Sequence, residues 1–124
     1  MAAPNLINTT TITGKMAYVA LSSTSATAVL SNAAASGKVF KVEQLVVSNS
    51  STTTAANITV SYYSAAALGG TAYPIVSTIS VPANASLIVM DKTTGIYLEE
   101  DKSIGATAGT ASVLTVTCAY EELY

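Results

Sequence analysis

Large side chains recur at every second position along most of this chain, and this period constrains the fold more than any other feature. Near the C-terminal end, Leu114, Val116, Cys118 and Tyr120 are separated by residues that are mostly small. A period of two places alternate side chains on opposite faces of a β-strand, whereas a helix requires a period of 3.6. β-branched residues dominate these segments, as is typical of strands. The chain is therefore predicted to be all-β.

The alternating segments are short, and turn-forming residues such as Gly37, Pro82 and Gly95 separate them. This arrangement is typical of a β-sandwich or a small barrel, and we predict a single antiparallel β-sandwich, of jelly-roll or immunoglobulin-like topology, over residues 12–124. A chain of 124 residues is long enough to bury a core within one domain. The strands are predicted at 12–21, 25–31, 38–48, 56–63, 75–81, 85–91, 95–99, 102–107 and 112–121.

Two segments depart from the alternating pattern. Residues 65–68 are Ala-Ala-Ala-Leu, which predicts a helical turn that Gly69 and Gly70 end. The segment from Lys38 to Asn49 loses its alternation around residues 44–47. It is predicted either to contain a β-bulge or to form a central strand covered on both faces. The pattern alone does not choose between these two.

Residues 1–11 are predicted to form an extended N-terminal arm, because this segment has no alternating pattern with which to join the sandwich. In an assembly, such an arm can add a strand to a neighbouring sheet through backbone hydrogen bonds. Asn5, Leu6 and Ile7 are the candidate contact residues on the arm. The alternative is a frayed terminus with no partner.

Most catalytic and ligand-binding chemistry lacks its usual residues here. The sequence has no histidine, arginine or tryptophan, and Cys118 is its single cysteine. Without histidine, Cys118 has no base of the Cys-His type, and it is expected to pack as a small apolar side chain. Glu99, Glu100 and Asp101 are consecutive, so they cannot all face one cation. The chain is predicted to be no enzyme and to use no cofactor or metal.

Charged residues make up only 10% of the chain, and its formal net charge is −2. Five lysines cannot form the basic patch that nucleic acid requires. So little charge predicts either a surface covered by neighbouring subunits or one solvated by Ser and Thr hydroxyls. Apolar runs fall short of the roughly 20 residues of a membrane span, and the N-terminal residues lack signal-peptide features. Neither nucleic acid nor a membrane is expected as a partner.

The tyrosines are the candidate contact residues on the sandwich, because tyrosine is enriched at protein interfaces. Tyr62 and Tyr63 are adjacent, so one is expected to point inward and the other outward. Tyr73, Tyr97 and Tyr124 are further candidates. The alternative is that each tyrosine caps the rim of the core with its hydroxyl in water.

Several segments together resemble a known group of proteins. The segments are 81–89 (VPANASLIV), 95–105 (GIYLEEDKSIG), 112–123 (SVLTVTCAYEEL), 38–49 and 57–60. In this order they are similar to small β-sandwich structural proteins from the virions of tailed bacteriophages, especially marine and cyanobacterial ones. The resemblance covers most of the chain from about residue 12 onward. It implies a fold and a setting, and it carries over no catalytic residue.

The resemblance implies a capsid decoration or cement protein that binds the assembled shell and stabilises it through subunit contacts. Its expected partners are the major capsid protein or other virion subunits and further copies of itself, with a trimer as one option. Its expected location is the virion, assembled in the host cytoplasm. The alternative is a neck, tail or fibre-attachment component. A carbohydrate-binding adhesion module is a further alternative, which the lack of tryptophan disfavours.

Overall fold

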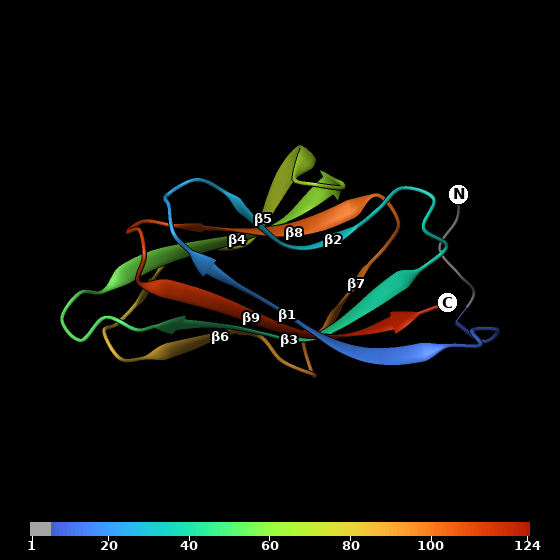
Figure 1. Cartoon of the computed structure of the whole chain (residues 1–124), viewed down its shortest axis with the longest axis horizontal. Helices are drawn as coiled ribbons and strands as arrows, with labels where there is room; N and C mark the ends of the chain where they lie inside the picture. Colours follow the sequence, from blue (N-terminus) through green and yellow to red (C-terminus); the bar gives the residue numbers. More distant parts are fainter. Residues whose placement is uncertain (1–5) are drawn as a thin grey trace.

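The computed structural model describes residues 6–124 and consists of two antiparallel sheets packed face to face (Figure 1). This confirms the all-β sandwich that the two-residue period predicts. The strands in chain order are β1 (Ile12–Leu21), β2 (Thr27–Asn32), β3 (Val39–Asn49), β4 (Ala56–Ala65), β5 (Gly69–Val81), β6 (Ser86–Met90), β7 (Ile96–Leu98), β8 (Lys102–Ala108) and β9 (Leu114–Leu123).

The strand order identifies the topology as a jelly roll. One sheet has the order β1-β9-β3-β6, with the short β7 also pairing with β3, and the other has the order β2-β8-β4-β5. The first two strands therefore pair with the last two, and the chain between them folds back in the same nested way (Figure 1). This double-sheet winding is the jelly roll. It settles the choice between the two sandwich topologies that the sequence leaves open.

The core lies between the sheets and is built from one face of each strand. In the β1-β9-β3-β6 sheet, Val19, Val116, Val47 and Leu87 are opposite one another in a continuous row. Val116 and Val47 are fully buried, while Val19 and Leu87, on the outer strands, are half-buried against the core. From the other sheet, Ile58, Val60 and Ile104 are fully buried among the residues that face this row.

The predicted helical turn at residues 65–68 is wrong. These residues form a tight hairpin turn between β4 and β5, in which the Gly69 amide donates to the Ala66 carbonyl at 3.1 Å. β5 also begins at Gly69 rather than near residue 75, so it includes both glycines and Pro74. Ala67 and Leu68 both have positive φ, as the primed hairpin turns require.

The predicted β-bulge in the segment 38–49 is confirmed, and the strand is central, but it is covered on one face only, since Gln44 is exposed on the other. β3 is central, because it pairs with β9 along one edge and with β6 and β7 along the other. It also carries irregularities, since its register against β9 shifts between Val42 and Gln44. The shift places Gln44 on the outside of the sheet and returns Leu45 to the core, which explains the lost alternation.

Candidate interaction surface

The outward side of the β1-β9-β3-β6 sheet carries an uncharged surface with several exposed large apolar side chains, which we call the outer face. Its central row runs across all four strands, because directly paired residues in antiparallel strands share a face. Tyr18 is opposite Thr117, Thr117 is opposite Val46, and Val46 is opposite Ile88. The flanking rows complete the outer face with Met16, Ala119 and Gln44 on one side and Ala20, Thr115, Ser48 and Ser86 on the other.

No charged residue belongs to these three rows, and their largest side chains are exposed. Tyr18 is 79% exposed, Ile88 60% and Met16 57%. Thr117 and Val46, between the exposed residues of the central row, are half-buried within the sheet. Monomeric proteins rarely expose contiguous apolar surface of this kind unless a partner covers it.

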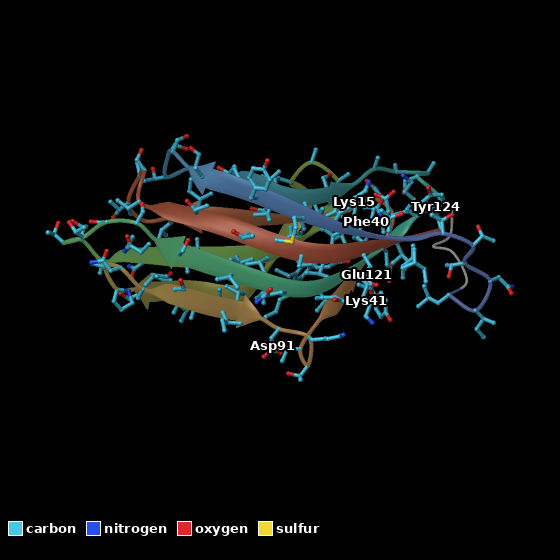
Figure 2. The ribbon with its side chains drawn as sticks, turned by 60° about the horizontal axis from the view of Figure 1, so that its bottom comes forward. Lys15, Phe40, Lys41, Asp91, Glu121 and Tyr124 are labelled. Carbon is cyan, nitrogen blue, oxygen red and sulfur yellow. The ribbon has the colours of Figure 1, made fainter. Side chains whose placement is uncertain are left out.

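Charged residues gather at one end of the outer face. Lys41 is directly opposite Glu121, and Asp91 lies in the neighbouring loop (Figure 2). Glu121 also shares a hydrogen bond with Glu43, which raises the pKa of the Glu121 carboxyl above its ordinary value. Two shallow depressions of about 380 and 350 Å³ meet here, and both are lined by Glu43 and Ala119. They are open to solvent, so they do not enclose a small molecule.

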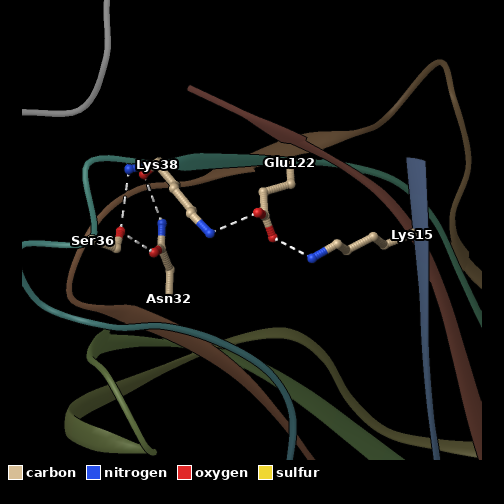
Figure 3. A network of polar contacts seen from close by, with 5 residues as sticks. All are labelled: Lys15, Asn32, Ser36, Lys38 and Glu122. Carbon is tan, nitrogen blue, oxygen red and sulfur yellow. Dashed lines mark hydrogen bonds and ion pairs between the residues drawn. The ribbon is translucent and has the colours of Figure 1, made fainter. Parts of the chain in front are cut away.

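A buried carboxylate anchors β1 and β9 at the same end of the sheet. Glu122 is 6% exposed and binds two lysines, with Lys15 Nζ at 2.9 Å and Lys38 Nζ at 2.8 Å (Figure 3). These two hydrogen bonds lower the pKa of Glu122 below its ordinary value. Nearby, the buried Asn32 side chain donates to the backbone carbonyls of Lys38 and Leu98 at 2.9 and 3.1 Å. The network has a structural role, because the two partly exposed lysines compensate the charge of the buried Glu122 carboxylate.

The β4–β5 hairpin tip folds against the other sheet and is held by side chains from outside the hairpin. Ser31 Oγ accepts from the Ala67 amide at 3.0 Å, and Ser103 Oγ accepts from the Leu68 amide at 2.9 Å. An Asp101 oxygen accepts from the Ala66 amide at 3.1 Å. These contacts place the tip over β2 and β8, where it covers part of that sheet.

The candidate contact residues do not form one site. Tyr62 points inward, packs against the core and donates its hydroxyl to the Tyr97 carbonyl at 3.1 Å. Tyr63 lies on the opposite face, next to Gly105, and is covered in part by the hairpin tip. The expectation of one inward and one outward tyrosine is therefore confirmed. Tyr73, Tyr97 and Tyr124 are exposed by 59%, 46% and 44% on different parts of the molecule.

The N-terminal arm is described only in part. Asn5 lies outside the described residues, while Leu6 and Ile7 are exposed, Ile7 by 91%. The amides of Thr10 and Thr11 both donate to the Tyr124 carbonyl, at 2.9 and 2.8 Å. The end of the predicted arm is therefore tied to the C-terminal residue.

Tyr18, the most exposed of the large side chains on β1, is absent from the sequence-based candidates. Its strand does alternate, but Met16 and Tyr18 are larger than the inward residues Ala17 and Val19. A pattern that assigns the larger side chains to the core therefore gives the wrong face for β1. The pattern in β9 indicates the correct orientation, because residues of β1 that are paired with the inward residues of β9 also point inward.

The remaining chemical candidates are structural. Cys118 is fully buried, and burial raises the pKa of its thiol to about 11, so it is a poor nucleophile. Glu99 and Asp101 are exposed while Glu100 is buried, and no group of three metal-ligating side chains occurs within residues 6–124. The same described residues contain no helix that could cross a membrane.

The fold and the outer face define an all-β sandwich protein with an uncharged sheet surface that exposes large apolar side chains. No family model matches the chain, and no curated protein matches its sequence. Among solved structures, the chain is similar to one described under the words "Bacillus endospore appendages form a novel family of disulfide-linked pili", with a TM-score of 0.51 and 16% identity. The similarity covers 100% of this chain and 96% of that chain. At this identity it shows a shared fold.

Proposed function

We propose that this protein is a structural subunit that acts by packing its outer face against other protein surfaces in a large assembly. The observation that carries the proposal is the three uncharged rows of the outer face, with Tyr18, Ile88 and Met16 all more than half exposed. A covered surface is also one of the two explanations for the low charge of the whole chain. The burial of Cys118 supports a structural role over a catalytic one.

The setting favoured by the sequence resemblance is a phage capsid, where the protein decorates the shell. A protein that binds the assembled shell but not its dissociated subunits stabilises the shell by mass action. The outer face suits this task because apolar area removed from water contributes roughly 25 cal/mol per Å² before the losses of association.

The test is to heat particles assembled with and without this protein and to measure disruption temperature and genome release. Ile88→Lys with Thr117→Lys places two charges in the central row, so the variant is expected to lose shell binding and the added thermal stability. Tyr73→Lys with Ile79→Lys is the matched control, because both side chains are comparably exposed on β5, away from the outer face. Equal disruption temperatures with and without the wild-type protein would contradict capsid stabilisation.

A second candidate is a subunit of a filament, and the structural similarity favours it. The similar protein belongs by its description to disulfide-linked pili. The only cysteine of the present chain, Cys118, is buried in β9, so a filament of this protein would be held by noncovalent contacts. Electron microscopy of the concentrated purified protein distinguishes the candidates, because filaments without any shell support the second one.

A further inference from the structure

The four strands that end the two sheets, β1, β6, β2 and β5, differ in how well they are protected against pairing with another chain. Exposed sheet edges are normally blunted by short length, bulges, proline, charge or a covering segment. β6 has five residues. β2 has six residues, its register shifts between Ala28 and Leu30, and the hairpin tip bonds to its Ser31. β5 contains Pro74 and is paired to β4 with several register shifts.

β1 has only one of these protections, a single lysine. Its ten residues pair with ten consecutive residues of β9 without a register shift. It contains no proline, and within the described part of the chain no strand pairs along its other edge. Its only charged residue is Lys15, whose ammonium is bonded to Glu122. β1 therefore presents a long and regular edge, and its one charge is already paired within the fold.

We propose that the free edge of β1 pairs antiparallel with β1 of a second copy about a two-fold axis at Ala17, which joins the two sheets into one. This deepens the proposed structural role and rests on it. The outer faces of both copies then become one continuous surface, because opposed residues of like parity lie on the same face of a sheet.

The charges and side chains of β1 fit a second copy in this register. Lys15 is opposite Val19 of the second copy, so no like charges meet. Met16 is opposite Tyr18 of the second copy, and the pair occurs twice across the axis. The thioether and the ring, exposed by 57% and 79% in the single chain, then cover each other.

Charge variants test the pairing together with its register. Met16→Lys with Tyr18→Lys places lysines opposite lysines, and sedimentation equilibrium is expected to show at least a tenfold weaker self-association. Met16→Glu with Tyr18→Lys places opposite charges together, so self-association is expected to stay within a few-fold of wild type. Both variants change exposed side chains, and matching thermal melts confirm that they are folded.

Disulfide trapping provides a second readout. A mixture of Met16→Cys and Tyr18→Cys proteins is expected to form a cross-linked dimer, whereas each variant alone is not, because its cysteines lie on the diagonal, about 7–8 Å apart. The buried Cys118 does not compete, since the pKa of its thiol is raised to about 11. The pairing is overturned if the double-lysine variant self-associates as strongly as the wild type. It is also overturned if the wild-type protein is monomeric at millimolar concentration. If such a protein still stabilises particles, the proposed function stands without the pairing.

Discussion

β1 and β5 both expose the unpaired backbone groups of an edge strand, but only β5 carries irregularities that hinder pairing with another chain. Both are long strands, of ten and thirteen residues, at the border of a sheet. β5 is irregular, with Pro74, two glycines at its start and a residue of positive φ at Thr78. β1 is regular over its whole length. The difference shows that this chain has the means to blunt an edge, and that it uses them on β5 and not on β1.

The two strands also differ in how they are attached to the fold. β1 is held by an uninterrupted ladder and by the ion pair of Lys15 with the buried Glu122. β5 depends partly on side-chain bonds. The Thr78 amide donates to Thr59 Oγ1 of the neighbouring β4 at 3.0 Å, and residues outside the hairpin hold its tip. The regular edge is thus fixed from within its own sheet, whereas the irregular edge is stabilised by scattered side-chain bonds.

The largest expected effect comes from the anchor of β1. Glu122→Gln is expected to lower the free energy of unfolding by about 2 kcal/mol, because two lysines then converge on a neutral amide. The value is reduced from that of a fully buried pair, since the Lys15 and Lys38 side chains are 44% and 35% exposed. Urea denaturation measures the change. Glu121→Gln is the matched control, and a loss as large as that of Glu122→Gln would contradict the assignment.

The same carboxylate predicts how this loss depends on pH. The folded-state pKa of Glu122 is lowered from 4.5, so its contribution is present above that value and is lost as the pH falls through the folded-state pKa. The difference between wild type and Glu122→Gln is expected to shrink as the pH falls from 7 to 3. Glu121, whose pKa is raised, acts in the opposite direction but is present in both proteins. A difference that is constant with pH would contradict this account.

On the β5 side, relief of backbone strain is expected to stabilise the fold. Ala67 has a φ of 55°, which lies in the left-handed region, and its side chain is exposed. Ala67→Gly is expected to raise the free energy of unfolding by about 0.5–1 kcal/mol, because glycine adopts this φ without steric cost. Ala66→Gly, beside it but without positive φ, is the control and is expected to be slightly destabilising. Thermal melts compare the two, and a loss of stability in Ala67→Gly would show that the turn is not strained.

The smallest expected change in stability is a test of how the β5 edge is protected. Pro74→Thr restores a backbone N–H on an exposed strand, so stability is expected to change by less than about 0.5 kcal/mol. Self-association is expected to increase, because the edge loses one of its barriers to pairing. Light scattering at increasing protein concentration measures this. An unchanged profile would mean that the bulges alone protect β5.

The sequence predicted the strands well where large and small residues alternate. β1 has the predicted bounds 12–21, and β9 has the predicted inward residues Leu114, Val116 and Cys118. It failed at residues 65–68, where alanine favours a helix locally but the folded chain imposes a hairpin turn. The bonds that hold this turn come from Ser31, Asp101 and Ser103, and no local pattern reveals such distant partners.

The candidate surface was less predictable than the fold. The outer face depends on the register of four strands. Tyr18 and Ile88 lie in the same row only because β9 and β3 pair between their strands. The sequence did indicate that the low charge could reflect a covered surface. It did not indicate which face, because on β1 the larger residues point away from the core.

The bonds between Thr10, Thr11 and Tyr124 have a mechanical consequence. β1 begins and β9 ends at the same end of their shared ladder (Figure 1). A force that pulls these two ends apart loads the hydrogen bonds one after another, as in opening a zipper. A force along opposite ends of the two strands would load all of them at once. The protein is therefore expected to resist tension poorly when the load enters where β1 begins and β9 ends, and much better when it enters at opposite ends of these two strands.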